Sequence, residues 1–181
     1  MARLVLAATL GASYGIYGPA FELCENRPLA PGREEYLDSE KYEIRHWDID
    51  RPDSLKEFIG VVNGIRRENP CLQTDEHLAF HPVDNEQMIA YSKTTDDLSS
   101  IVLTVVNLDP HHTQAGWVDL PLPDLGLDPA VPFQGHDLIS GARYIWHGSR
   151  IYFLLNPAEV PAHIVLIRRK VRTERDFDYF M

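Results

Sequence analysis

The part of the sequence that follows Pro70 is a series of short runs of β-branched and aromatic residues separated by turn signals. Asp96-Asp97, Ser140-Gly141 and Gly148-Ser149 mark three of these turns. The candidate strands are residues 77–81, 88–93, 101–108, 116–122, 133–137, 143–146, 150–155 and 162–168. Short, evenly spaced strands of this kind are typical of an antiparallel β-sandwich. The pattern predicts a β-sandwich domain over residues 71–170, followed by a tail at 171–181.

Residues 1–70 instead show the alternation of helix and strand that is typical of α/β folds. Residues 2–10 are predicted to form a helix that ends at Gly11, and the apolar and aromatic residues 13–17 a buried strand that ends at Gly18-Pro19. Residues 21–53 are rich in charge and proline without a sustained period, which predicts a long loop. A loop of this length in a compact domain is usually functional.

A second helix is predicted to begin at Ser54, which forms a capping box with Glu57. Its apolar stripe consists of Leu55, Phe58, Ile59, Val62 and Ile65. Asn69-Pro70 ends it. A helix with one apolar face after a buried strand is typical of the outer ring of a (β/α)8 TIM barrel. Residues 1–70 are therefore predicted to be the last βα unit of such a barrel, with the missing material upstream.

The charge balance disfavours two classes of partner. The formal net charge is -10, whereas nucleic acids and anionic membranes are held mainly by clustered Lys and Arg. The basic run at 168–175 is interpreted as a solvated tail. No stretch approaches the roughly 18–20 apolar residues of a membrane span. We therefore expect neither nucleic acid nor membrane as a partner.

Cysteine usage and the opening residues bear on the compartment. Cys24 and Cys71 have no metal-ligand spacing, which fits a reduced, cytoplasmic protein. Residues 1–10 have the character of a weak signal peptide, but their short apolar run suits a buried helix at least as well.

Four segments carry a resemblance to a known family. SYGIYGPAFELCE at 13–25 resembles the eighth-strand motif of α-amylase-type barrels. With FELCEN at 21–26, EEYLDSEKYE at 34–43 and NLDPHHTQ at 107–114, the chain resembles the bacterial α-1,4-glucan:maltose-1-phosphate maltosyltransferases of the α-amylase superfamily. The resemblance extends from the last barrel strand through the β-sandwich and fades after about Lys170.

The resemblance implies that the chain is the C-terminal portion of a larger homodimeric enzyme that needs no metal or organic cofactor. Such enzymes transfer maltosyl units from α-maltose 1-phosphate to the non-reducing ends of α-1,4-glucans and release phosphate. In their retaining mechanism an Asp attacks the anomeric carbon and a Glu protonates the leaving group. Those carboxylates lie on earlier barrel strands in this family, so the chain is expected to hold no catalytic residue and to be inactive alone.

The donor-phosphate site is the part of the family's machinery that the resemblance places in this chain, at Lys41 and Tyr42. An ammonium group and a hydroxyl donor suit a phosphate monoester dianion. Lys41 is the only cation between Arg33 and Arg45 and has many acidic neighbours. Without the resemblance, a solvated lysine that makes surface ion pairs is the favoured interpretation, and the resemblance favours the phosphate site instead.

Other residues of the first part have both functional and structural interpretations. Glu22 and Glu25 follow the predicted barrel strand, where active sites collect, and are the candidates for a general acid and base. The resemblance assigns catalysis elsewhere, which favours a structural role such as bracing the Lys41 loop. Tyr14 and Tyr17 are candidates for stacking on a sugar, but packing in the core is favoured.

Histidine and tryptophan in the β-sandwich are open to the same two interpretations. His111-His112, with His81 or His136, suggests a metal cluster, but the spacing of known zinc sites is absent and structural contacts are favoured. Trp117 and Trp146 are expected to fill the core, with a sugar-binding platform as the alternative. No serine-hydrolase elbow or Gly-rich phosphate loop is found.

Two other functions remain open at this point. One is a stand-alone glucan-binding or assembly β-sandwich module without catalysis. The other is a different member of the α-amylase superfamily, such as a trehalose-forming isomerase or a glucan hydrolase. The Lys41-Tyr42 pair disfavours the latter, because a donor without phosphate has no use for that cation.

Overall fold

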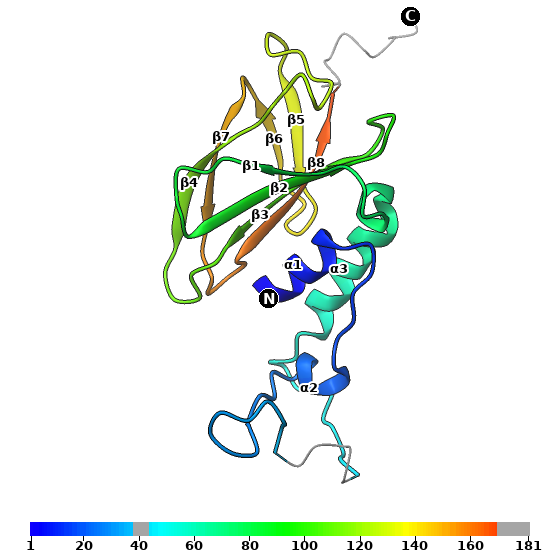
Figure 1. Ribbon diagram of the computed structural model, residues 1–181, viewed down its shortest axis with the longest axis vertical. Helices are drawn as coiled ribbons and strands as arrows, with labels where there is room; N and C mark the ends of the chain where they lie inside the picture. Colours follow the sequence, from blue (N-terminus) through cyan, green and yellow to red (C-terminus); the bar gives the residue numbers. More distant parts are fainter. Residues whose placement is uncertain (38–43, 170–181) are drawn as a thin grey trace, which may run out of the picture.

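The predicted strands form two antiparallel sheets that face each other (Figure 1). The computed structural model describes residues 1–37 and 44–169. The strands are β1 (Leu78–His81), β2 (Met88–Thr94), β3 (Ile101–Asn107), β4 (Gln114–Asp119), β5 (Phe133–Asp137), β6 (Arg143–Trp146), β7 (Arg150–Leu155) and β8 (Ala162–Arg168). Six of them form one sheet in the order β1-β2-β3-β8-β5-β6, and β4 pairs with β7 in the other. The prediction of an antiparallel, sheet-rich fold is confirmed.

The limits of the strands follow the local chemistry. β5, β6, β7 and β8 have the predicted bounds, and along β7 exposed and buried side chains alternate, as expected for a strand with one face on the core. β4 ends at Asp119, three residues before the predicted limit. Pro121 and Pro123 have no N–H to donate to the ladder with β7. Leu120 and Leu122 are nevertheless buried in the core between the two sheets.

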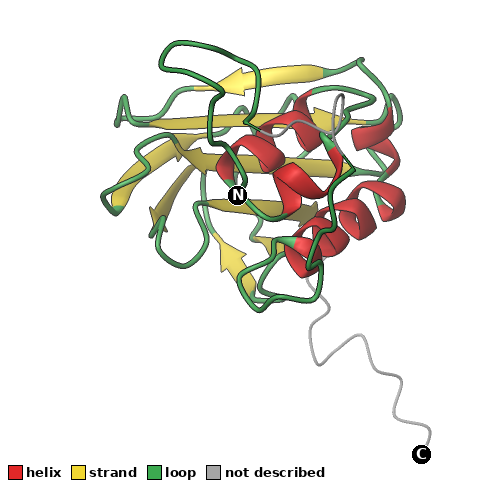
Figure 2. Cartoon of the chain, turned by 90° about the horizontal axis from the view of Figure 1, so that it is seen from below, coloured by secondary structure: helices red, strands yellow, loops and turns green. Residues whose placement is uncertain are grey.

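β3 is buried on both faces because each face meets a different layer. Leu103 and Val105 point toward the β4-β7 sheet, into the core of the sandwich. Val102 and Val106 point the other way, toward the helices. The helices are α1 (Ala2–Leu10), α2 (Gly18–Glu22) and α3 (Lys56–Glu68), and a 3₁₀ turn, η1, spans Pro70–Gln73. α1 and α3 lie against the six-stranded sheet, and α2 lies apart from it (Figures 1 and 2).

Two buried or half-buried cations hold the carboxyl end of α1 in place. Lys93, on β2, donates from Nζ to the carbonyl of Leu10 over 3.1 Å and also to the carbonyl of Thr74. Arg66, on α3, donates to the carbonyl of Ala12 over 2.6 Å. Arg66 also donates to the carbonyl of Ala8, so the two cations satisfy the Ala8 and Leu10 carbonyls, which the helix leaves unpaired at its end and where the helix dipole favours positive charge. α1 is thereby fixed to both α3 and the sheet.

Two expectations for residues 1–70 are wrong in the described structure. Residues 13–17 form no strand, because a strand needs a neighbour to pair with and none lies beside this segment. The βα unit of a TIM barrel is therefore not confirmed. The capping box is also absent: Ser54 Oγ accepts the N–H of Lys56 over 3.1 Å and donates to Glu22 rather than pairing with Glu57.

The predicted division at residue 70 stays a prediction. Side chains of α1, α3 and η1 share one core with β3 and β8, across that boundary. Among the described residues no helix is both long and apolar enough to cross a membrane.

Candidate functional site

The predicted donor-phosphate residues, Lys41 and Tyr42, lie outside the described residues, so their assignment stays a prediction. The described chain before them turns back on itself: the N–H of Leu37 donates to the carbonyl of Arg27 over 2.8 Å, and Pro28 and Tyr36 form an isolated antiparallel bridge. This small hairpin leads directly toward residue 38.

Glu22 and Glu25 join the two ends of the long loop. The carboxylate of Glu22 accepts the hydroxyl of Ser54 over 3.1 Å, and its carbonyl accepts the N–H of Leu55 over 2.8 Å. Glu25 lies 3.9 Å from the guanidinium of Arg51, which also donates to Asp53. These contacts match the bracing role that the sequence favours for the two glutamates.

The two tyrosines of this part have different environments. The hydroxyl of Tyr14 donates to Asn63 on α3, and the guanidinium of Arg66 lies 5.2 Å from its ring centroid. Tyr14 is half-buried and packs against the helix–sheet core. Tyr17 is 51% exposed and its ring lies 5.7 Å from that of Tyr36, so the expectation that it packs in a core is wrong.

The histidines singled out from the sequence are engaged separately. His81 Nε2 bonds the hydroxyl of Ser92 over 2.8 Å, and His136 lies on β5 with its Nδ1 lacking a hydrogen-bond partner among the described residues. His112 contacts Asp109, whose carboxylate also accepts the backbone N–H of His111 over 2.8 Å. The N–H of His111 is the main reason that the pKa of Asp109 falls to about 2, with burial opposing it. The NLDPHHTQ segment thus has a structural role, as the turn between β3 and β4.

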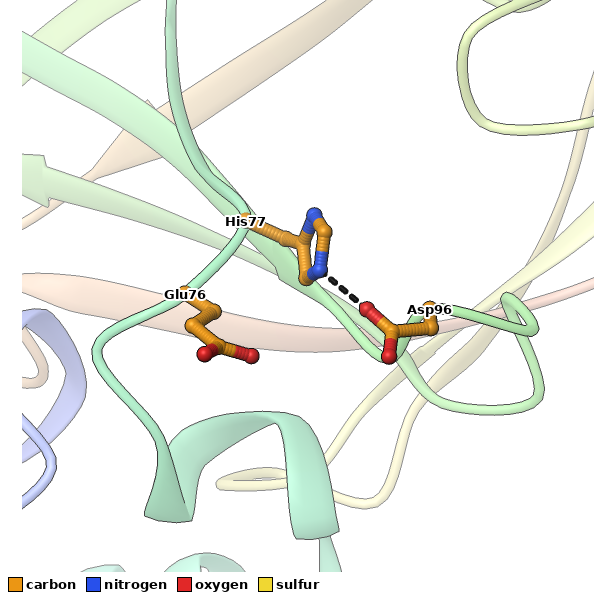
Figure 3. Close-up of side chains that lie close together, drawn as sticks. All are labelled: Glu76, His77 and Asp96. Carbon is orange, nitrogen blue, oxygen red and sulfur yellow. Dashed lines mark hydrogen bonds and ion pairs between the residues drawn. The ribbon is translucent and has the colours of Figure 1, made fainter.

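A group of metal-ligand side chains that the sequence analysis missed lies at the start of β1. Glu76, His77 and Asp96 bring one ligand atom each to within 4.8 Å of one another, and they are the only such trio in the part of the chain that the structure describes. His77 Nε2 is hydrogen-bonded to Asp96, and all three side chains are exposed (Figure 3). Exposed polar residues at the mouth of a hairpin pair in this way without a ligand, so the trio by itself assigns no function.

Aromatic side chains gather along β6 and β7. Trp146 packs edge-on against Phe133 and Phe153, 5.8 Å from each ring centroid, and against the sandwich core as predicted. Trp117 is 41% exposed and lies 5.3 Å from the ring of Tyr152, so its predicted core position is wrong. Side chains of β6, β7 and β8 line a hollow of about 230 Å³ between the sheets.

A buried carboxylate that is hydrogen-bonded to a histidine lies beside this hollow. Asp137, at the end of β5, is 1% exposed and accepts from His163 Nδ1 over 3.0 Å and from the hydroxyl of Ser140. Burial raises the pKa of Asp137, but the bonds from His163 and Ser140 outweigh it and leave the pKa below its ordinary value. Asp137 is therefore a carboxylate, which only accepts, so His163 Nδ1 carries the proton. Neither residue was singled out from the sequence.

The lowered pKa of Asp137 predicts a pH dependence of stability. A carboxylate whose pKa is lower in the folded state stabilises the fold above its unfolded pKa of about 3.9, and loses that contribution as the pH falls through the folded value. Urea unfolding of the wild type and Asp137→Asn at pH 6 and pH 3 should show a stability difference that shrinks toward pH 3. An equal difference at both values would contradict the assignment.

Comparisons with known proteins agree with this architecture. Residues 80–167 match the family model described as "GLGE, C-terminal". The chain is 48% identical over 168 residues to the α-1,4-glucan:maltose-1-phosphate maltosyltransferase of Chlorobaculum tepidum, covering 90% of this chain and 25% of that protein. It is 41% identical over 178 residues to the enzyme of the same name from Myxococcus xanthus, covering 98% and 26%.

Solved structures show the same fold at lower sequence identity. A structure of AmyP in complex with maltotriose is 17% identical, with a TM-score of 0.63, and is matched over 94% of this chain and 34% of that one. An α-amylase from Geobacillus thermoleovorans complexed with acarbose is 16% identical, with a TM-score of 0.57 and the same coverage. These similarities concern the fold alone.

The chain spans about a quarter of the length of the curated relatives that it matches. The high identity covers both the helical part and the β-sandwich, and the family model covers most of the latter. Residues 80–167 thus carry the C-terminal domain of the GLGE family, and the chain is similar over nine tenths of its length to α-1,4-glucan:maltose-1-phosphate maltosyltransferases.

Proposed function

We propose that this chain is the C-terminal part of a cytoplasmic, homodimeric maltosyltransferase. The whole enzyme would transfer maltosyl units from α-maltose 1-phosphate to the non-reducing ends of α-1,4-glucans with retention, and release phosphate. The observation that carries the proposal is the 48% identity with a named maltosyltransferase over 90% of this chain. Identity of this extent over both parts of the chain favours a shared role over the alternative of a module that has lost its connection to catalysis.

The role proposed for this chain is to supply the donor-phosphate contacts, Lys41 and Tyr42. The Lys41 ammonium provides a point charge for the phosphate dianion and the Tyr42 hydroxyl a hydrogen bond. Support comes from the flanks of the loop, which are tied together by Glu22 with Ser54 and by Glu25 with Arg51. A loop that is closed at its base loses less entropy when a ligand binds than a loop with free ends.

The catalytic carboxylates are proposed to come from chain that precedes this portion. Within this chain the two glutamates considered as general acid and base make other contacts: Glu22 accepts a hydrogen bond from Ser54, and Glu25 lies near Arg51. The resemblance gives the nucleophile and the acid–base to earlier barrel strands. The isolated chain is therefore expected to have no transferase activity.

A chimera tests this function. This chain replaces the matching 168 residues of the Chlorobaculum tepidum relative, and phosphate release is followed with α-maltose 1-phosphate and maltohexaose. We expect the chimera to release phosphate and the 181-residue chain alone to release none. Lys41→Ala in the chimera should lower kcat/KM by roughly 10²- to 10³-fold, the usual effect of losing one preorganised charge contact.

Lys56→Ala is the matched control, because Lys56 is an exposed lysine on the other side of the loop whose partner is the exposed Asp50. It should leave kcat/KM unchanged. Phosphate release by the 181-residue chain alone would overturn the proposal and make Glu22 and Glu25 the first candidates for catalysis. A Lys41→Ala chimera as active as the control would remove Lys41 from the donor site.

A further inference from the structure

The β-sandwich is open along one side, where β6 and β7 run as neighbouring but unpaired edge strands (Figure 1). β6 ends the six-stranded sheet, and β7 pairs with β4 alone. Two hollows, of about 230 Å³ and about 420 Å³, lie there and share His163 and Leu154 as lining residues. We call this continuous depression the edge groove; its main side chains are Tyr144, Trp146, Tyr152, His163, Asn156 and Glu159.

One end of the edge groove is aromatic. Tyr144 and Trp146, both on β6, are stacked with their rings 8° from parallel and their centroids 6.1 Å apart. Tyr152, on β7, lines the same hollow, and it is 51% exposed where Tyr144 is 43% exposed. Rings with this much free surface present flat apolar faces to solvent, which in monomeric proteins often marks a binding site.

The backbone fixes the position of the central ring. A Cβ on Gly135 would lie 2.5 Å from the ring of Trp146, so only glycine fits opposite this side chain. Phe133 and Phe153 contact the same ring from the core side. Trp146 is therefore held before any ligand arrives, and a preorganised platform loses little entropy on binding.

The other end of the edge groove carries hydrogen-bonding groups. His163 is oriented by its bond to the buried Asp137, and its Nε2 has no hydrogen bond among the described residues. Asn156 and Glu159 lie 3.3 Å apart at the same end. Neither hollow has Lys or Arg among its lining residues, and the chain carries a net charge of -10. An anionic ligand is disfavoured, and a neutral molecule with both apolar faces and hydroxyl groups fits.

We propose that the edge groove binds a neutral oligosaccharide chain. The C–H faces of its sugar rings stack on Tyr144, Trp146 and Tyr152, and its hydroxyl groups bond to His163, Asn156 and Glu159. His163 faces the core side of β8, opposite to the face that α1 and α3 cover, so this site is separate from the helices and from the loop that they flank. The ligand to which we commit is an α-1,4-linked glucan, and this choice rests on the proposed function.

Isothermal titration of the 181-residue chain tests the groove with maltohexaose, cellohexaose and α-maltose 1-phosphate as separate ligands. We expect maltohexaose to bind at millimolar concentration and the other two to bind much more weakly. Tyr144→Ala and Tyr152→Ala should each weaken maltohexaose binding by about tenfold, as expected for one lost stacking contact. Both side chains are exposed, so thermal melting should show the variants to be folded.

Phe80→Ala is the matched control, because Phe80 is a 60% exposed aromatic residue on β1, the opposite edge of the same sheet. It should leave the affinity unchanged. No binding of maltohexaose, equal binding of cellohexaose, or binding that survives both Tyr substitutions would overturn the proposal. If the chimera releases phosphate but the 181-residue chain binds no maltohexaose, only the edge-groove proposal is contradicted. If the 181-residue chain binds maltohexaose but the chimera releases no phosphate, only the transferase function is contradicted.

Discussion

Asp137→Ala is expected to lower the free energy of unfolding by about 1.5–3 kcal/mol, the usual contribution of hydrogen bonds to a charged group. The Asp137 carboxylate is 1% exposed and accepts the N–H of Ser140 over 3.2 Å, the hydroxyl of the same residue, and His163 Nδ1 over 3.0 Å. Its removal leaves these donors without the acceptor that they share. Urea unfolding at pH 7 measures the effect.

Asp124→Ala is the matched control for this substitution. Asp124 is exposed and lies in the turn after β4, so its removal should change stability by less than about 0.5 kcal/mol. A loss for Asp137→Ala as small as that for Asp124→Ala would show that the buried pair does not stabilise the turn between β5 and β6. Asp137→Ala should also weaken maltohexaose binding, because His163 loses the partner that orients it.

Leu4→Ala is expected to cost about 2–5 kcal/mol, the range for a fully buried leucine. Leu4, on α1, is 1% exposed and belongs to the cluster that contains Val62 of α3 and Val106 of β3. Because that cluster joins residues on both sides of position 70, the loss should appear in one cooperative transition of the whole chain. Far-UV circular dichroism follows the helices of the first part, and tryptophan fluorescence in a Trp47→Phe background follows the β-sandwich, which contains Trp117 and Trp146.

Leu29→Ala is the control, because Leu29 is 52% exposed in the loop. Its effect should stay within about 0.5 kcal/mol. If Leu4→Ala shifts the circular dichroism transition and leaves the fluorescence midpoint unchanged, the two parts unfold independently. That outcome would support the boundary predicted at residue 70 against the single transition expected here.

Residue patterns alone could predict only part of the candidate sites. Lys41 and Tyr42 are assigned by resemblance to the family, since a lysine among acidic residues has no distinguishing local signal. The bracing role favoured for Glu22 and Glu25 agrees with their contacts to Ser54 and Arg51. The group of Glu76, His77 and Asp96 was missed, because Asp96 lies in the turn between β2 and β3, far along the chain from the other two residues.

The Asp137–His163 pair was missed because its two residues are 26 positions apart and meet only through the pairing of β5 with β8. A signal was nevertheless present. His163 is followed by Val165 and Ile167 on the same face of a β-branched strand, which places a polar ring at an inward position. Polar residues at inward positions of a strand need a buried partner, and such positions are worth searching in related sequences.

The sequence by itself determined the bounds of β5 to β8, because the period of two and the turn residues between the strands are local properties. It also determined α1 and the extent of α3, through their apolar stripes. Only the tertiary structure decided the order of strands in the sheet, the exposure of Trp117, and the fate of residues 13–17, which are apolar enough for a strand but have no neighbour to pair with. These features depend on contacts between residues far apart in the chain, whose partners no local pattern specifies.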